Sequence, residues 1–363
     1  MWEKQLERLN AIDKLIKTIL AHNDFYENKD LRIFPKKQKE LWEEGFDEEQ
    51  NKYVGAKWGK YLRAPEIFFK ILEKGKGKLI PLKEVAEVRR GFTTGANEFF
   101  YLTKKEIKRW GIEREFLEPV IFSLKEIEKY YVDKSRLKYK VLICDKEKNE
   151  LEGTNVLKYI EWGERKGFHK RPTCASRKPW YSLAKNRKYA SLIFPEKVGE
   201  RMPIFYSNNT YEDKKLYGIL PKDNKDCDII FSILNSTLTR MFIEFTCRQL
   251  TGAQAIADID VIVVEKLLIP NPNKLSVSIK QKLRKLAEKL RNTKSESIFK
   301  EIGNSIEEID ISKIKPERYE LDKIIMGEIL GLTEEEQLEV YKAVIDLVKS
   351  RIEKAKSVKR NKK

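Results

Sequence analysis

The side chains best suited to contacting a partner lie in residues 85–102, which read Val-Ala-Glu-Val-Arg-Arg-Gly-Phe-Thr-Thr-Gly-Ala-Asn-Glu-Phe-Phe-Tyr-Leu. An apolar run ends at Arg89 and Arg90, and a segment with two glycines, two threonines and an asparagine then leads into an aromatic run. This order predicts strand, turn and strand, with hydrogen-bonding groups at the tip. Glycine permits close approach of the main chain, so the turn can lie against a phosphate backbone. The alternative is an ordinary hairpin whose glycines only make the bend.

Positive charge is concentrated in residues 165–188, which contain nine lysines and arginines, no acidic residue and the interleaved rings of Phe168, Trp180 and Tyr181. Cations neutralise phosphates, and aromatic rings stack on bases or wedge between them. The whole chain has 74 lysines and arginines against 57 acidic residues, a net charge of +17. A polyanion is therefore the expected partner. A solvated lysine-rich loop is the alternative interpretation of this run.

A second glycine turn is expected at residues 247–254, Cys-Arg-Gln-Leu-Thr-Gly-Ala-Gln, directly after a predicted helix. We expect the basic run to contact phosphates and the two turns to read base edges. Guanidinium groups suit guanine, and the amide groups of asparagine and glutamine suit adenine. The candidate DNA-binding residues are Arg89, Arg90, Thr93, Thr94, Asn97, Lys170, Arg171, Arg177, Lys178, Trp180, Tyr181, Arg187, Arg248, Gln249 and Gln254.

The sequence predicts no catalytic residue and no metal site. Residues 55–61 are one residue short of a phosphate-binding loop and end in tyrosine, and the glycine fingerprint of dinucleotide-binding folds is absent. A nuclease-like triplet, Glu106-Ile-Lys108, is expected by chance in a chain so rich in both residues. His169 lacks a partner for a nucleophilic pair, and the four cysteines are not spaced as a disulfide framework or a zinc site.

Length and composition indicate a globular protein of two or three domains, since 363 residues with 41% hydrophobic and 36% charged content can bury sizeable cores. No apolar run approaches the roughly 18 residues of a membrane span, and no signal peptide is evident, so a cytoplasmic protein is expected. The excess of lysine, glutamate and isoleucine, with few glutamines, resembles the composition of thermophile proteins.

The expected fold class is α+β, with a mixed, mainly β domain flanked by helical regions. Short apolar and aromatic runs separated by glycine, proline and asparagine predict the strands, and helices at 104–110 and 226–246 are expected to interrupt them. Thr333 and Glu336 have the spacing of a capping box at the start of a C-terminal helix. The expected segments are an N-terminal helical connector at 1–78, the mainly β domain at 79–272, a C-terminal helical region at 273–358 and a basic tail at 359–363.

Six short segments carry a family resemblance through their order and spacing. They are Val-Arg-Arg-Gly-Phe-Thr-Thr-Gly-Ala-Asn-Glu-Phe at 88–99, Lys-Pro-Trp-Tyr at 178–181, Ile-Leu-Asn-Ser-Thr-Leu at 233–238, Arg-Gln-Leu-Thr-Gly-Ala-Gln at 248–254, Leu-Leu-Ile-Pro-Asn-Pro at 267–272 and Gly-Leu-Thr-Glu-Glu-Glu at 331–336. With them, residues 58–358 resemble the C-terminal part of TaqI-like adenine-specific DNA methyltransferases, including the fused type IIG restriction-modification enzymes. That part contains the target-recognition domain, so the resemblance implies that 79–272 recognise a DNA sequence.

The sequence also departs from this family. The glycine-rich S-adenosylmethionine loop and the Asn/Asp/Ser-Pro-Pro-aromatic motif that holds a flipped adenine have no counterpart in it. The resemblance therefore implies a recognition half, and S-adenosylmethionine would belong to a catalytic half supplied in trans or lost. The expected partners are double-stranded DNA and a methyltransferase or restriction catalytic subunit. Two other interpretations stay open: a stand-alone nuclease or methyltransferase with a degenerate site, and a structured-RNA-binding protein.

Overall fold

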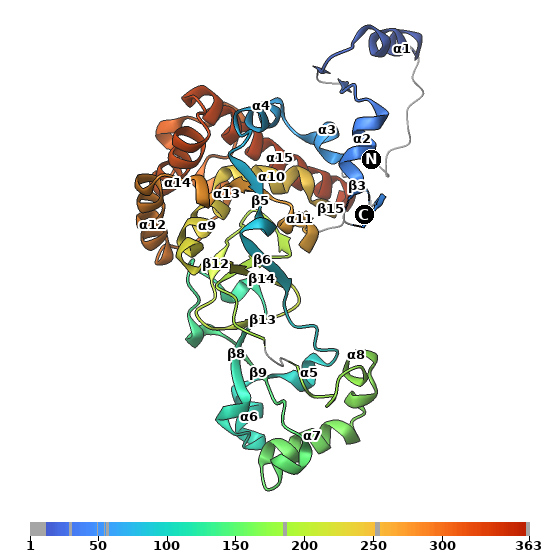
Figure 1. Ribbon diagram of the computed structural model, residues 1–363, viewed down its shortest axis with the longest axis vertical. Coiled ribbons are helices and arrows are strands. Elements are labelled where there is room, and N and C mark those ends of the chain that lie inside the picture. Colours follow the sequence, from blue (N-terminus) through green and yellow to red (C-terminus); the bar gives the residue numbers. More distant parts are fainter. Residues whose placement is uncertain are drawn as a thin grey trace.

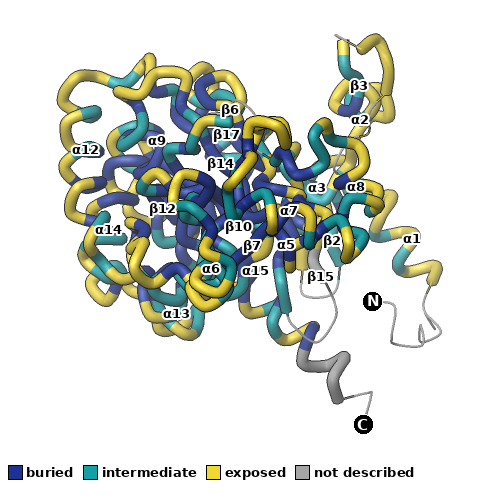
Figure 2. Tube along the Cα trace, turned by 90° about the horizontal axis from the view of Figure 1, so that it is seen from below, coloured by how far each residue is buried: buried dark blue, intermediate teal, exposed yellow. Residues whose placement is uncertain are grey.

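The computed structural model describes residues 12–28, 31–48, 50–53, 55, 58–183, 187–250 and 255–360, with the main chain alone at 249–250 and 356–360. A helical body forms one end of the long axis, a smaller lobe forms the other, and the central strands lie between them (Figure 1). Seen from below, the buried residues concentrate in the interior and the exposed ones around the periphery (Figure 2). Within the described residues, none of the helices combines the length and apolar character that crossing a bilayer requires.

The centre of the body is a pair of almost wholly buried helices, α9 and α10. Ser236 caps α10 by accepting a hydrogen bond from the Thr239 amide at 3.2 Å, so the single helix expected at 226–246 is divided in two. The helices of the body are α3 (Gly59–Arg63), α4 (Glu66–Lys74), α9 (Cys227–Leu234), α10 (Thr237–Thr246), α11 (Val261–Glu265), α12 (Val277–Arg291), α13 (Ile298–Glu301), α14 (Pro316–Asp322), the π-helix η11 (Lys323–Ile329) and α15 (Glu334–Arg360).

The start of α15 confirms the expected capping box. The Thr333 amide donates to Glu336 at 2.8 Å, and the Glu336 amide donates to the Thr333 hydroxyl at 3.2 Å. Reciprocal bonds of this kind satisfy main-chain donors that have no partner inside the helix. The chain is thereby directed into the long helix that packs across α10.

Small sheets connect the body to the lobe. One antiparallel sheet has the order β12-β10-β14-β6, and another has the order β13-β8-β9-β7, in which β13 and β8 are parallel. The strands are β5 (Leu79–Pro81), β6 (Ala86–Arg90), β7 (Tyr101–Leu102), β8 (Leu117–Ile121), β9 (Tyr139–Leu142), β10 (Leu192–Pro195), β11 (Lys197–Val198), β12 (Phe205–Tyr206), β13 (Tyr211–Glu212), β14 (Leu216–Pro221), β15 (Arg248–Leu250), β16 (Ile256–Asp258) and β17 (Leu268–Pro270). β5 pairs with β17, and a further three-stranded sheet has the order β11-β16-β15.

The lobe has its own aromatic core, in which Phe99, Phe100 and Tyr159 are buried. The ring of Phe99 stacks on Tyr159 at 4.9 Å and packs against Trp180 at 4.7 Å. Such ring contacts add to the stability that burial provides, and they fix how the segments cross. The helices around this core are α5 (Asn97–Phe100), α6 (Lys104–Trp110), α7 (Asn155–Arg165) and α8 (Pro172–Ala175).

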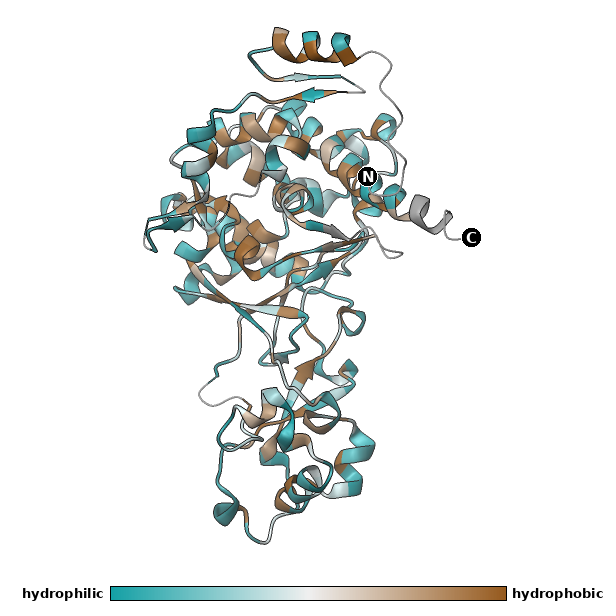
Figure 3. Ribbon diagram, turned by 90° about the vertical axis from the view of Figure 1, so that its right-hand side faces the viewer, coloured by the Kyte–Doolittle hydropathy of each residue, from teal (hydrophilic) through white to brown (hydrophobic). Residues whose placement is uncertain are grey.

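The N-terminal segment lies beside the body at the top of the molecule. Its first described helix, α1 (Ile12–Ala21), has no buried residue, and Leu20 is 75% exposed. The brown apolar residues of α1 are visible at the top of Figure 3. The remaining elements of the segment are β1 (Tyr26–Glu27), β2 (Arg32–Ile33), α2 (Gln38–Gly45), β3 (Phe46–Asp47) and β4 (Lys52–Tyr53).

The expectation of a mainly β domain is wrong, because the described residues are 51% helical and 17% strand, with many small sheets. Residues 261–265 have β-branched side chains that favour a strand, yet they form α11. Residues 155–165 form α7, whose apolar residues recur at helical spacing, and the sequence analysis did not predict this helix. β-branched and aromatic residues fit any half-buried surface, so their local preference gives way where a helix packs them better.

Candidate nucleic-acid interface

The first glycine turn leaves β6 against the protein's own main chain. The Gly91 amide donates to the Leu216 carbonyl at 2.9 Å, and the Phe92 amide donates to the Glu212 carbonyl at 2.8 Å. A Cβ atom at Gly91 would collide with the carbonyls of Glu212 and Asp213. Glycine is therefore required at this position by packing within the protein.

The segment has a strand at each end, β6 and β7, as expected, but the two strands do not form a hairpin. β6 pairs with β14, whereas β7 pairs with β9 in another sheet. Gly95 has a φ of 78°, which favours glycine, and Asn97 begins the short helix α5. The turn is thus a connection between two sheets at the junction of body and lobe.

Arg177, from the basic run, holds this turn by its main chain. Its guanidinium donates to the carbonyls of Thr93 at 2.5 Å and Thr94 at 2.9 Å. The central carbon (Cζ) of its guanidinium also lies 5.5 Å from the centre of the Phe100 ring. Because the forked guanidinium bonds two successive carbonyls, it fixes the path of the turn as well as carrying charge.

Arg171, from the same run, also bonds the turn. It donates to the Gly95 carbonyl at 3.3 Å and to the Glu98 carboxylate at 2.6 Å. The Glu98 contact raises the pKa of the Arg171 guanidinium, and the same hydrogen bond lowers the pKa of Glu98. Arg171 and Arg177 therefore approach the turn from the side of α8.

A buried carboxylate organises the arginines at the end of β6. Glu212 is completely buried, forms a hydrogen-bonded ion pair with Arg187 and lies 3.8 Å from the Arg89 guanidinium. Arg187 also donates to the Arg90 carbonyl at 2.9 Å. Burial and the neighbouring Arg187 lower the pKa of Arg89. With two guanidiniums around one carboxylate, this cluster keeps a surplus positive charge.

Ion pairs also connect the first turn to the hairpin that carries the second. Arg90 pairs with Glu196 at 2.9 Å, and the next residue, Lys197, lies 4.0 Å from Asp258. Asp258 in turn pairs with Arg248 at 2.5 Å. Since β11 pairs with β16 and β16 with β15, these ion pairs connect the end of β6 to the strands on either side of residues 251–254, which lie outside the described residues. The structure thus brings Arg90 and Arg248 into one connected region.

The candidate residues differ in what they present to solvent. Thr94 is buried and its hydroxyl donates to Asn97, whereas Thr93 and Asn97 are exposed. Lys170, Lys178 and the neighbouring Lys188 are exposed too, and in the described part of the chain no acidic group pairs with them.

The two aromatic candidates belong to the lobe core. Tyr181 is 1% exposed and donates to the Lys146 carbonyl at 2.8 Å, while Trp180 is half-buried and donates to Glu164 at 3.0 Å. Both rings therefore position the main chain of the basic run. Gln254 lies outside the described residues, and Gln249 is described by its main chain in β15.

Acidic partners are what the sequence reasoning missed at this site. Glu98, Glu196 and Glu212 each pair with a candidate arginine. Glu98 belongs to the first turn, and Glu212 is followed directly by Asp213. The residues next to these two glutamates do not indicate which distant arginine each one pairs with. No local signal could have found these pairs.

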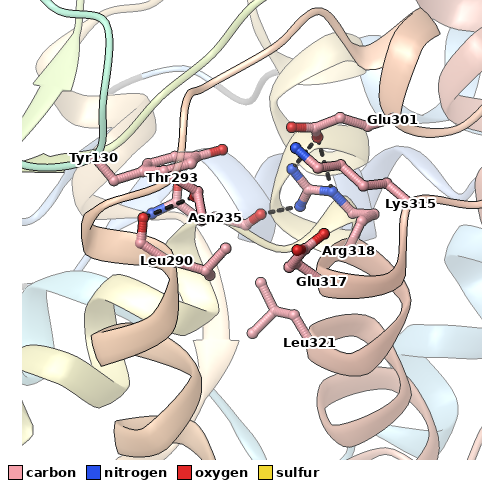
Figure 4. Close-up of a pocket in the computed structure, with 9 residues that line it drawn as sticks. All are labelled: Tyr130, Asn235, Leu290, Thr293, Glu301, Lys315, Glu317, Arg318 and Leu321. Carbon is pink, nitrogen blue, oxygen red and sulfur yellow. Dashed lines mark hydrogen bonds and ion pairs between the residues drawn. The ribbon is translucent and has the colours of Figure 1, made fainter.

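The cavity of Figure 4 is a packing junction. It is lined by nine residues around Arg318, which donates to Glu301 at 2.5 Å and also bonds the Asn235 carbonyl. Its volume of about 10 Å³ is close to the least that a single water molecule needs. Among the residues with described side chains, no group of three histidines, cysteines or acids could hold a metal ion.

Comparison with known proteins connects this geometry to DNA-modifying enzymes. Residues 55–306 match the family model described as the C-terminal domain of type II methyltransferase M.Eco57I. The type II methyltransferase M.AccI of Acinetobacter calcoaceticus is 28% identical over 183 residues, which cover 47% of this chain and 33% of that protein.

Comparison with solved structures gives two alignments, of which the first shows a similar fold. The type IIG restriction endonuclease BpuSI aligns with a TM-score of 0.54 and 14% identity, over 84% of this chain and 35% of that one. The type IIL restriction-modification enzyme MmeI, solved in complex with DNA, aligns with a TM-score of 0.49 and 15% identity, over 75% of this chain and 36% of that one. The matches thus span about a third of the length of each of these relatives.

Proposed function

Because this chain belongs to the family of the M.Eco57I C-terminal domain, we propose that it binds duplex DNA and supplies sequence recognition to a type II DNA methyltransferase or restriction-modification enzyme. The observation that carries the proposal is the first glycine turn, whose main chain is held by Arg171 and Arg177 of the basic run. A preorganised turn costs little conformational entropy when it binds.

The exposed side chains divide into two roles. Lys170 and Lys178 contact phosphates, because they are exposed cations and phosphate contacts give affinity without sequence information. Thr93 and Asn97 read base edges, since both are exposed on the fixed turn and an asparagine amide matches adenine. Arg177 acts indirectly, as the group that holds this turn in place.

The methyl-transfer chemistry is assigned to a catalytic domain acting with this region. S-adenosylmethionine does not fit the glycine turn described above, because Gly91 is packed against the main chain of residues 212–213 and leaves no space there for a ligand.

The apolar face of α1 is the proposed contact with that catalytic domain. Ile12, Ile16 and Leu20 are 55%, 47% and 75% exposed, and an amphipathic helix gains free energy when such a face is covered. The test is to supply a type II methyltransferase catalytic region from the same genome and measure methylation. We expect this chain to stimulate methylation by that catalytic region. The double substitution Ile16→Glu and Leu20→Glu should abolish the stimulation, whereas Lys14→Glu should not.

The DNA proposal is tested by selection from a random duplex library. The protein should enrich one short sequence, and duplex DNA should compete better than structured RNA at fixed salt. Binding without enrichment would contradict sequence recognition, and stronger competition by RNA would favour an RNA-binding function instead.

A further inference from the structure

A second basic surface lies on the lobe away from the glycine turn. It is a groove of about 410 Å³ between the start of α6 and strands β8 and β9. Figure 1 places α6 and β8 on the left of the lobe and α5 and α8 on the right. The buried side chains of Leu102, Leu117 and Leu137 contribute to the apolar lining of the groove.

Five cations line this groove: Lys104, Arg114, Lys134, Lys138 and Lys140. Within the described ranges, no acidic side chain forms an ion pair with any of them, whereas Arg171 and Arg187 near the turn each have a carboxylate partner. The acidic residue of the groove, Glu118, accepts a hydrogen bond from the Tyr189 hydroxyl at 2.7 Å.

The charge of the groove has a physical consequence. The five cations outnumber the single carboxylate of the groove and repel one another, and apolar walls concentrate their field toward an incoming anion. Lysine is a flexible point charge that binds phosphate without fixing a base-pair identity. The ring of Tyr139, which also lines the groove, has the Lys138 ammonium 4.9 Å from its centre, so it is already engaged by a cation.

We infer that this groove binds the phosphate backbone of duplex DNA outside the segment contacted by the glycine turn, and does so independently of sequence. The inference rests on the proposed DNA-binding function and adds a second contact surface to it. The groove volume is more than ten times the roughly 30 Å³ that one water occupies in the liquid, so a phosphodiester can enter it. Duplex DNA that reaches both surfaces is thereby held by two sides of the lobe.

The experiment measures the salt dependence of binding to a 40-base-pair random duplex pool. Each lost phosphate contact lowers the slope of log K against log salt by about 0.9, so Lys104→Gln, Lys134→Gln and Lys138→Gln together should lower it by about 2.7. All three lysines are exposed, so folding should be unaffected. If the triple variant fails to fold, the single variants Lys104→Gln and Lys138→Gln should each lower the slope by about 0.9.

The matched control removes three lysines that already have acidic partners. Lys282, Lys289 and Lys315 pair with Glu328, Glu320 and Glu296, and their replacement by Gln changes the net charge equally. A wild-type slope in the groove variant, or an equal loss in the control, would overturn the inference. A loss seen with structured RNA and not with duplex DNA would overturn it too. Failure of the proposed function is distinct, because the wild-type protein would then not enrich a sequence.

Discussion

Arg351 of α15 and Glu244 of α10 form an ion pair of 2.9 Å that is closed to solvent on both sides. The remaining donors of Arg351 bond the carbonyls of Gly199, at 3.1 Å, and Ala255. Ala255 stands directly after residues 251–254 of the second glycine turn and has a φ of 49°. The C-terminal helix therefore anchors the exit of that turn, far from it in sequence.

Replacing Arg351 by Ala should lower the free energy of unfolding by about 1.5–3 kcal/mol, because the buried Glu244 loses one of two guanidinium partners and keeps Arg240, at 2.6 Å. Urea denaturation followed by circular dichroism measures this change. Lys349→Ala, an exposed position on the same helix, is the control and should stay within about 0.5 kcal/mol of wild type. An Arg351 variant as stable as the control would show that the pair contributes little.

Adjacent residues of the basic run should have separable effects. Arg177→Lys keeps the charge and loses the forked donor to Thr93 and Thr94, so sequence preference should fall about tenfold, or about 1.4 kcal/mol, with the salt slope unchanged. Lys178→Gln should lower the slope by about 0.9 and leave preference intact. Fluorescence anisotropy with the selected duplex and a scrambled one measures both. Identical behaviour of the two variants would contradict this division.

Asn97 should contribute discrimination rather than general affinity. Asn97→Ala removes an exposed amide whose oxygen also accepts the Thr94 hydroxyl, and about 1–3 kcal/mol of preference at one base pair should be lost. The same selection experiment measures it, as relaxed preference at a single position. Lys170→Gln is the control, which should weaken binding to every duplex alike. Uniform weakening by the Asn97 variant would assign it a supporting role instead.

The cysteine thiols should be unreactive in the folded protein. Burial raises the pKa of Cys227 to about 11 and of Cys247 to about 12, so very little thiolate is present at pH 8. Labelling with a thiol reagent at pH 8 should be slow natively and should reach all four cysteines in denaturant. For Cys227, reaction should accelerate as the pH approaches 11. Fast native labelling at pH 8 would mean that these thiols are accessible.

Local patterns predicted some of the helices, and they failed for the pairing of distant segments. Helix α6 and the capping box at Thr333 depend on neighbouring residues and are confirmed, whereas α7 was missed. The strands expected within 85–102 are present, but the alternative of an ordinary hairpin is wrong because β6 pairs with β14. Whether a strand pairs with its neighbour or with a remote segment is decided by tertiary packing, which spacing does not encode.

The same limit applies to the candidate site. Positive charge at Arg177 and Arg187 is evident from the sequence, but their attachment to the main chain of residues 90–94 is not. Gly91 was expected to let a partner approach closely, and the close neighbour is the main chain of residues 212–213. Residue type indicated which groups matter, and the fold determines which of them face solvent.

Arg177 donates hydrogen bonds to the main-chain carbonyls at positions 93 and 94 and not to the side chains there. Every amino acid has such a carbonyl. The main-chain path of the turn therefore does not depend on the side chain at position 93. Substitutions at this position leave the hydrogen bonds of the turn intact, so variants of this gene could evolve new DNA-sequence preferences through single exposed side chains.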